Sequence, residues 1–148
     1  MPHVTVKPLD VLVVDDDPLD RQLIQKAFDD AKSEIQLHFK SNGASALDYL
    51  LGRDGEVAGK PDACLFDINM PGLSGIDLLR KLKGDADLRK IPVVMLSSSD
   101  RPEDIDQCYD LQACGYVCKP SDYREMNEIV AAIANFWENT VKFRSRTG

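Results

Sequence analysis

The sequence predicts an α/β fold in which helices cover both faces of a parallel sheet. Short apolar, often β-branched runs alternate five times with segments whose apolar residues recur at helical spacing. Such alternation joins parallel strands through right-handed crossovers. The run Val11–Val14 is uninterrupted, as expected of a strand covered on both faces. The 148 residues are enough for one domain of this kind and too few for two ordinary ones.

The first strand is expected over Asp10–Val14 and ends at three consecutive aspartates. Asp17 can cap the following helix, and Pro18 suits its first position because proline has no N–H to leave unpaired. The apolar residues of this helix are expected on one face: Leu19, Leu23, Ile24, Ala27 and Phe28.

The second strand is expected near the sheet edge, because apolar and polar residues alternate over 35–40 and leave one face in water. Either Ser41 or Asn42 can cap the next helix. Its buried side is expected to comprise Ala46, Leu47, Leu50 and Leu51. The stretch Gly52–Pro61 is rich in glycine and charge and is expected to be a loop.

The third and fourth strands repeat the pattern of the first. Ala63–Phe66 ends at Asp67 and leads through a Pro/Gly turn into an amphipathic helix. Ile91–Leu96 ends in three serines and precedes a helix that opens near Pro102. Both runs are apolar throughout, apart from a tolerable proline at the start of the second, which is typical of central strands.

The fifth strand, Tyr116–Cys118, is short and ends at Lys119. Ser121 is expected to cap the final helix. Near the end of that helix, Phe136 and Trp137 allow two interpretations. They either complete its buried stripe or, if one is exposed, anchor a dimer or a partner, since aromatic residues concentrate at such contacts.

The composition excludes several classes of protein. Eighteen basic residues against 25 acidic ones give a net charge of −7, which opposes non-specific binding to nucleic acid or anionic membranes. No apolar run approaches the ~20 residues that span a bilayer, and no secretory signal is evident, so a cytoplasmic protein is expected. The four cysteines form no C-x-x-C pair and lie far from both histidines, so neither a zinc site nor a disulfide framework is predicted.

Chemically active groups follow four of the predicted strands. Asp15 and Asp16 follow the first strand, Asp67 the third, Ser97 the fourth and Lys119 the fifth. In an open parallel sheet, functional groups collect beyond the carboxyl ends of the strands. Each residue alone has an ordinary explanation as a turn, a cap or a surface charge. Their joint occurrence predicts a site of acids, a hydroxyl and an ammonium.

The acids of this predicted site need a cation. Carboxylates about 4 Å apart repel by roughly 4 kcal/mol per pair at an effective dielectric near 20. Hard oxygen ligands suit Mg²⁺, and Mn²⁺ could replace it. An open metal site beside Lys119 and Ser97 suits a phosphoryl group. Asp67 is the best candidate nucleophile, because it ends a central strand and enters a turn that leaves its oxygens accessible; its attack on phosphorus gives an aspartyl phosphate.

The sequence resembles the receiver domain of two-component response regulators. The matching segments, spread over about 110 residues in the family's order, are VLVVDD (Val11–Asp16), LFDINMPGLSG (Leu65–Gly75), VVMLS (Val93–Ser97) and GYVCKP (Gly115–Pro120). The resemblance implies a flavodoxin-like, doubly wound (βα)₅ three-layer sandwich with strand order 2-1-3-4-5. It places the receiver domain at residues 1–140 and a short basic tail at 141–148, with no output domain.

The same resemblance assigns the residues of the phosphorylation site. Asp67 is implied as the phosphoacceptor. Asp16 is implied as a direct Mg²⁺ ligand, Asp15 as a ligand through the water shell of the metal, and the backbone carbonyl of Asn69 as a further ligand.

The resemblance also implies a switch. Lys119 would pair with the phosphoryl group, and Ser97 would turn its hydroxyl toward it. Tyr116 matches the aromatic position that moves inward when Ser97 does, and Asn69 and Ser99 occupy positions that tune the lifetime of the phosphoryl group. The movement would alter the surface of the fourth helix, fifth strand and fifth helix.

The implied function is that of a stand-alone response regulator, which is a signalling phosphoacceptor and not an enzyme. It would receive a phosphoryl group from a sensor histidine kinase or a histidine phosphotransfer protein, and would signal to a downstream protein. A homodimer through the surface named above is a hypothesis. The longer loop Gly52–Pro61, the serine run at 97–99 and the terminal Phe136–Thr140 segment also resemble single-domain regulators that partner bacterial phytochrome-type kinases.

Three other interpretations of these residues are disfavoured. A flavin binder on the same fold would need a loop offering N–H groups to phosphate after the first strand, and here that loop is 15–17, all aspartate. A phosphatase working through an aspartyl phosphate usually needs an acid/base two residues after the nucleophile, where Asn69 stands. A receiver acting only as a scaffold is disfavoured because the pocket is complete.

Overall fold

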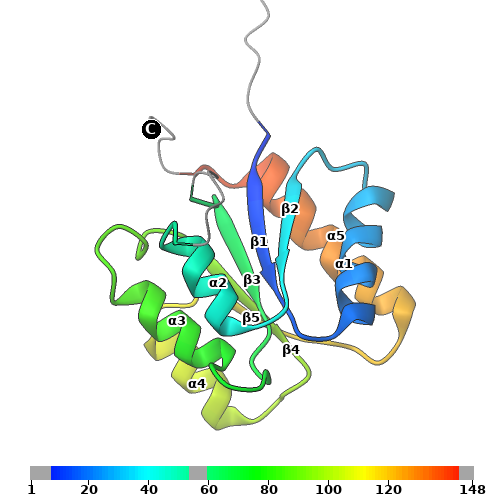
Figure 1. Ribbon diagram of the computed structural model, residues 1–148. Coiled ribbons are helices and arrows are strands. Elements are labelled where there is room, and N and C mark those ends of the chain that lie inside the picture. The colour runs from blue at the N-terminus through cyan, green and yellow to red at the C-terminus, as the bar shows by residue number, and fades with distance from the viewer. Residues whose placement is uncertain (1–7, 54–59, 144–148) are drawn as a thin grey trace, which may run out of the picture.

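The computed structural model describes residues 8–53 and 60–143. In this part of the chain five parallel strands form one sheet in the order β2-β1-β3-β4-β5 (Figure 1). The strands are β1 (Asp10–Val14), β2 (Gln36–Lys40), β3 (Ala63–Phe66), β4 (Val93–Ser97) and β5 (Gly115–Cys118). The order confirms the predicted flavodoxin-like fold: β2 lies at one edge, and the acid-bearing strands β1 and β3 are neighbours at the centre.

Helices cover both faces of the sheet (Figure 1). The helices α1 (Pro18–Asp30) and α5 (Tyr123–Asn135) lie side by side on one face. The other face carries α2 (Gly43–Leu50), α3 (Gly75–Lys83) and α4 (Pro102–Asp110). A π-helical turn, η1 (Phe136–Thr140), continues α5.

The core divides into two halves, one on each face of the sheet. Along β1, Val11 and Val13 pack in the half under α1 and α5, whereas Leu12 and Val14 pack in the half under α2, α3 and α4. All four are buried, because successive side chains of a strand point to opposite faces. The predicted burial of this strand on both faces is therefore confirmed.

Side chains at the helix starts fix where several helices begin. Asp17 accepts a hydrogen bond from the Leu19 N–H at 2.9 Å, as predicted, with Pro18 following it. Asn42, one of the two predicted candidates, caps α2. The cap of α5 is Asp122, so the prediction of Ser121 was wrong by one residue. The Asp122 carboxylate accepts hydrogen bonds from the N–H groups of Arg124 and Glu125, whereas Ser121 lies before the cap.

Some predicted core positions are exposed. Leu19 and Leu51 were expected on buried helix faces, but they lie at or next to the ends of α1 and α2, beyond the reach of the core, and are exposed. Of the two aromatic residues near the end of α5, Trp137 is 2% exposed and belongs to the core, whereas Phe136 is 51% exposed. Sequence alone left both interpretations open.

Two predicted segments lie partly outside the described residues. Of the loop Gly52–Pro61, residues 54–59 are not described. Of the predicted tail, residues 144–148 are not described, while Val141 and Phe143 pack against the core under α1 and α5.

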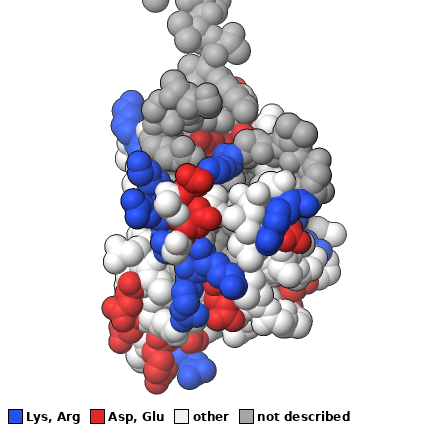
Figure 2. Space-filling view, turned by 60° about the vertical axis from the view of Figure 1, so that its left-hand side comes forward, with Lys and Arg blue, Asp and Glu red and all other residues white. Residues whose placement is uncertain are grey.

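The surface on the side of α2, α3 and α4 mixes charges of both signs. Figure 2 shows basic and acidic side chains next to one another there. Among the described residues, no helix is long and apolar enough to cross a membrane.

Candidate functional site

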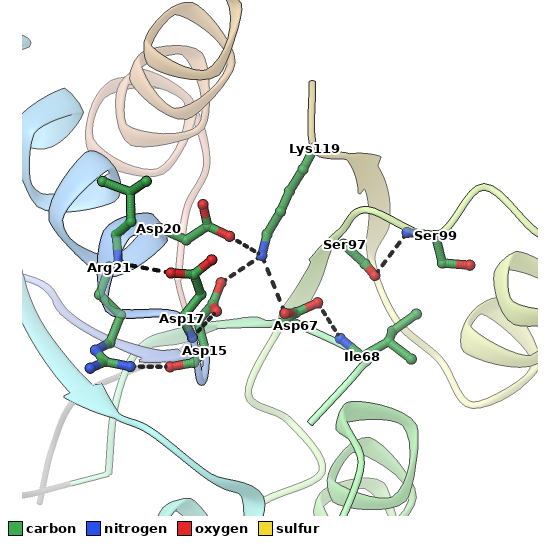
Figure 3. A network of polar contacts seen from close by, with 10 residues as sticks. Asp15, Asp17, Asp20, Arg21, Asp67, Ile68, Ser97, Ser99 and Lys119 are labelled. Carbon is green, nitrogen blue, oxygen red and sulfur yellow. Dashed lines mark hydrogen bonds and ion pairs between the residues drawn. The ribbon is translucent and has the colours of Figure 1, made fainter. Parts of the chain in front are cut away.

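The sheet brings the predicted groups to one edge. The backbone of each group continues the pairing of the strands: the Asp15 N–H donates to the Lys40 carbonyl at 3.1 Å, and the Asp67 N–H donates to the Val14 carbonyl at 2.9 Å. The Lys119 N–H donates to the Ser97 carbonyl at 2.7 Å. The rigid sheet therefore fixes where these side chains start, and Figure 3 shows them gathered at the strand ends.

Three carboxylates form a cluster in this site. Asp15, Asp16 and Asp67 each offer an oxygen, and these oxygens lie within 4.8 Å of one another. Asp15 and Asp67 are buried and Asp16 is exposed, so the cluster is open to solvent on one side. Buried carboxylates this close are stable only with positive charge beside them. The donor set fits a hard divalent cation that keeps some of its own water.

Lys119 supplies positive charge to this cluster of carboxylates. Its ammonium donates to Asp15 at 2.7 Å, to Asp20 at 2.8 Å and to Asp67 at 3.2 Å (Figure 3). Only 9% of the lysine side chain is exposed. The contact to Asp67, the longest of the three, is the one that joins the lysine to the predicted nucleophile.

Asp20 was missed in the sequence. It lies in the first turn of α1, three residues after the cap Asp17, where an acid is ordinarily explained by the favourable helix dipole. The available signal was that α1 starts at the same sheet edge as the acid cluster, so its first turn faces the site.

Burial and ion pairing oppose each other in this site. Burial raises the pKa of the Asp15 carboxyl, and the hydrogen bond from Lys119 only partly offsets this effect. For Lys119 itself, burial acts to lower the pKa, but the hydrogen bonds to Asp15 and Asp20 and the charges of Asp15 and Asp67 outweigh burial and hold the pKa above its ordinary value. The ammonium is therefore charged throughout the physiological range.

The two oxygens of Asp67 have different partners. One accepts from the Ile68 N–H at 2.7 Å, and the other accepts from Lys119. The loop that follows is held close, because a Cβ at Gly75 would lie 2.7 Å from the Asp67 carbonyl carbon and closer still to its oxygen. Asn69 lies in this loop with its side chain exposed.

Ser97 lies on the other side of Asp67, at the end of β4, and is buried. Its hydroxyl accepts from the Ser99 N–H at 3.2 Å (Figure 3). The Ser99 carbonyl accepts from the Tyr116 hydroxyl at 2.9 Å, and the Ser99 hydroxyl donates to Asp104 at 2.6 Å. Hydrogen bonds thus connect the site to β5 and to the first turn of α4. Tyr116 packs against the core under α2, α3 and α4, and burial raises the pKa of its hydroxyl.

The fold and this site define a class: a doubly wound α/β protein with a cluster of acids and a lysine at the carboxyl edge of its sheet. Within that class, the chain belongs to the response regulator receiver domain family, whose model matches residues 11–131. Members of this family are signalling domains of two-component systems that are phosphorylated on an aspartate; they are not classical enzymes.

Several known proteins are similar over almost the whole chain. Response regulator Rcp1 of Synechocystis sp. is 29% identical, over 90% of this chain and 92% of that protein. Its Mn(2+)-bound crystal structure has a TM-score of 0.88 at 28% identity and covers 93% of this chain and 100% of that one. The phosphorylated cyanobacterial phytochrome response regulator RcpA has a TM-score of 0.89 at 31% identity, with 94% and 100% covered. The two-component response regulator ARR17 of Arabidopsis thaliana is 32% identical, with 86% of each chain covered.

Proposed function

We propose that this protein receives a phosphoryl group on Asp67 from a histidine kinase or a histidine phosphotransfer protein, in a Mg²⁺-dependent reaction. The observation that carries the proposal is the position of Asp67 at the end of β3, the central strand. Its neighbours β1 and β4 supply the acids Asp15 and Asp16 on one side and Ser97 on the other, and Lys119 contacts it directly. Among the three clustered acids, Asp67 alone has all these groups around it.

The transfer needs an accessible oxygen and compensation of charge. An Asp67 oxygen attacks phosphorus, the bond from phosphorus to the donor imidazole nitrogen breaks, and that nitrogen takes up a proton. Asp15, Asp16, Asp67 and the backbone carbonyl of Asn69 would hold the metal ion. Bound there, Mg²⁺, or Mn²⁺ in its place, supplies positive charge to the phosphoryl oxygens. Lys119 offers a fixed charge to the same oxygens.

The phosphoryl group would then act on Ser97. It adds about −1.5 to −2 charge to a site that already holds several acids. Ser97 now accepts a hydrogen bond from Ser99 and can turn its hydroxyl proton to a phosphoryl oxygen. The loop that carries Ser99 is bonded to Tyr116 and to Asp104, so its displacement would change the surface of α4, β5 and α5. Asn69 and Ser99 would tune how long the group persists.

The proposed partners follow from the same likeness. The similarity to phytochrome response regulators supports a phytochrome-type sensor kinase upstream, acting in the cytoplasm. The α4-β5-α5 surface would contact a downstream protein or a second copy of the chain. A scattering mass that stays monomeric with and without a phosphoryl analogue would contradict the homodimer.

The test of Asp67 is the intact mass after incubation with acetyl phosphate and Mg²⁺. We expect one added phosphoryl group on the parent, none after chelation of the metal, and none on Asp67→Asn. The matched control is Asp62→Asn, which changes a carboxylate at the other end of β3, and it should be phosphorylated like the parent. Labelling of Asp67→Asn to the same extent as the parent would contradict the assignment.

A further inference from the structure

The contact between Lys119 and Asp20 is not accounted for by the proposed phosphotransfer. Asp20 lies in the first turn of α1, not directly after a strand, and it is not part of the acid cluster of Asp15, Asp16 and Asp67. Even so, its oxygen lies 2.8 Å from the lysine nitrogen, closer than the oxygen of Asp67. Its side chain is 24% exposed, at the rim of the site.

Lys119 has no donor to spare. An ammonium carries three N–H groups, and three carboxylates lie within hydrogen-bond distance of this one. A phosphoryl oxygen on Asp67 can therefore gain a donor only if one carboxylate gives it up. Asp15 and Asp67 can share their charge with a metal ion, whereas Asp20 has Lys119 as its one cationic partner among the residues that the structure describes.

We propose that Asp20 is a positioning residue that draws the Lys119 ammonium toward α1, away from Asp67, whose contact with the ammonium is the longest of the three. This inference rests on the proposed function of Asp67. In the unphosphorylated protein, Asp20 leaves the Asp67 oxygen that Lys119 contacts freer to bind a metal ion. In the phosphorylated protein, Asp20 competes with the phosphoryl group for the same N–H.

The two effects of removing the carboxylate have opposite signs. Without it, the third N–H of Lys119 turns toward Asp67, and the ammonium charge moves toward the cation site, so Mg²⁺ binds less tightly. When a phosphoryl group or its analogue is present on Asp67, the same N–H of Lys119 can donate to it. The variant also lacks the negative charge of Asp20, which would otherwise repel the phosphoryl group. The analogue then binds more tightly. A residue that merely supported the fold would weaken both.

The test compares Asp20→Asn with the parent in two titrations. The Mg²⁺ affinity is measured by calorimetry, and the beryllofluoride affinity is measured at saturating Mg²⁺ by ¹⁹F NMR. We expect the first to fall and the second to rise, each about threefold, as fits a partly exposed ion pair. Asp29→Asn, the same charge change at the far end of α1, is the matched control and should leave both affinities close to those of the parent.

Asp20→Ala repeats the test with a residue of high helix propensity if the asparagine variant unfolds. Affinities that change in the same direction, or that change equally in Asp29→Asn, would overturn the role of Asp20. A parent that binds beryllofluoride while Asp20→Asn matches it in both titrations overturns this inference alone. A parent that binds no beryllofluoride overturns the function proposed for Asp67, and the role of Asp20 with it.

Discussion

Helices α3 and α4 lie next to each other on one face of the sheet, yet they are anchored very differently. In α3 five of the nine residues are buried, among them Leu78, Leu79 and Leu82, whereas in α4 only Cys108 is. Ser74 and Asp77 form a reciprocal capping box at the start of α3. The N-cap of α4 is Arg101, whose side chain makes no capping hydrogen bond.

This difference separates a helix that holds the site from one that can respond to it. Helix α3 follows the Asp67 loop, and Gly75 packs against the Asp67 backbone, so movement there would displace the proposed phosphoacceptor. Helix α4 is tied to the site through Ser99 and Asp104 and buries little apolar surface of its own. Segments with few buried contacts open at the lowest free-energy cost. The weakly held helix α4 is therefore the one that is hydrogen-bonded to the loop after Ser97, where a change at Asp67 would be transmitted.

The largest effect is expected from emptying the core under α3. Leu79→Ala should lower the free energy of unfolding by about 3 kcal/mol, because a fully buried leucine leaves a cavity. Ile105→Ala in α4 is the matched change at a half-buried position and should cost less than about 1.5 kcal/mol. Urea unfolding measures both. Equal losses would remove the contrast between the helices.

A smaller loss of stability, with a larger loss of function, is expected at Gly75. Its Cβ would meet the Asp67 backbone, so Gly75→Ala should cost about 2 kcal/mol and sharply reduce phosphorylation by acetyl phosphate. Gly84→Ala, at the other end of α3, is the control. There the nearest atom to an added Cβ is 3.3 Å away and φ is −82°, so both stability and phosphorylation should stay near the parent values.

The capping difference can be changed from either side. Ser74→Ala removes the cap of α3 and should cost about 1 kcal/mol, whereas Arg101→Ser offers α4 a cap and should gain about 0.5 kcal/mol. Denaturant midpoints test both values. If Arg101→Ser lowered the free energy of unfolding, the missing cap would not explain why α4 is held more weakly than α3.

The smallest effect is a dependence on pH confined to α3. Hydrogen bonds from the Ser74 hydroxyl and backbone lower the pKa of Asp77 below its ordinary value of 3.8. A carboxyl whose pKa is lower in the folded state stabilises the fold above the unfolded value and loses that contribution as the pH falls through the folded value. Because Asp77 is half exposed, we expect less than about 1 kcal/mol. The stability difference between the parent and Asp77→Asn should shrink below pH 3.8; a constant difference would contradict this cause.

Much of the fold and part of the site followed from the sequence. The uninterrupted run Val11–Val14 predicted a strand buried on both faces, and the structure buries it there. The convergence of Asp15, Asp67 and Lys119 followed because parallel strands end at one sheet edge. These inferences needed only periodicity and the direction of the strands.

Other features depend on tertiary geometry. The contact of Asp20 with Lys119 spans 99 positions and depends on how α1 meets the sheet, which no local pattern encodes. Leu19 is exposed because it lies in the first turn of α1, beyond the part of the helix that packs on the core.

The most direct test of the account is amide hydrogen exchange of the parent with and without Mg²⁺ and beryllofluoride, with Asp67→Asn as the control. We predict that exchange changes over the Ser97–Ser99 loop, α4 and β5, stays constant over α3, and is unaltered everywhere in Asp67→Asn. Changes concentrated in α3, or equal changes in Asp67→Asn, would contradict the claim that phosphorylation of Asp67 acts through the weakly held helix.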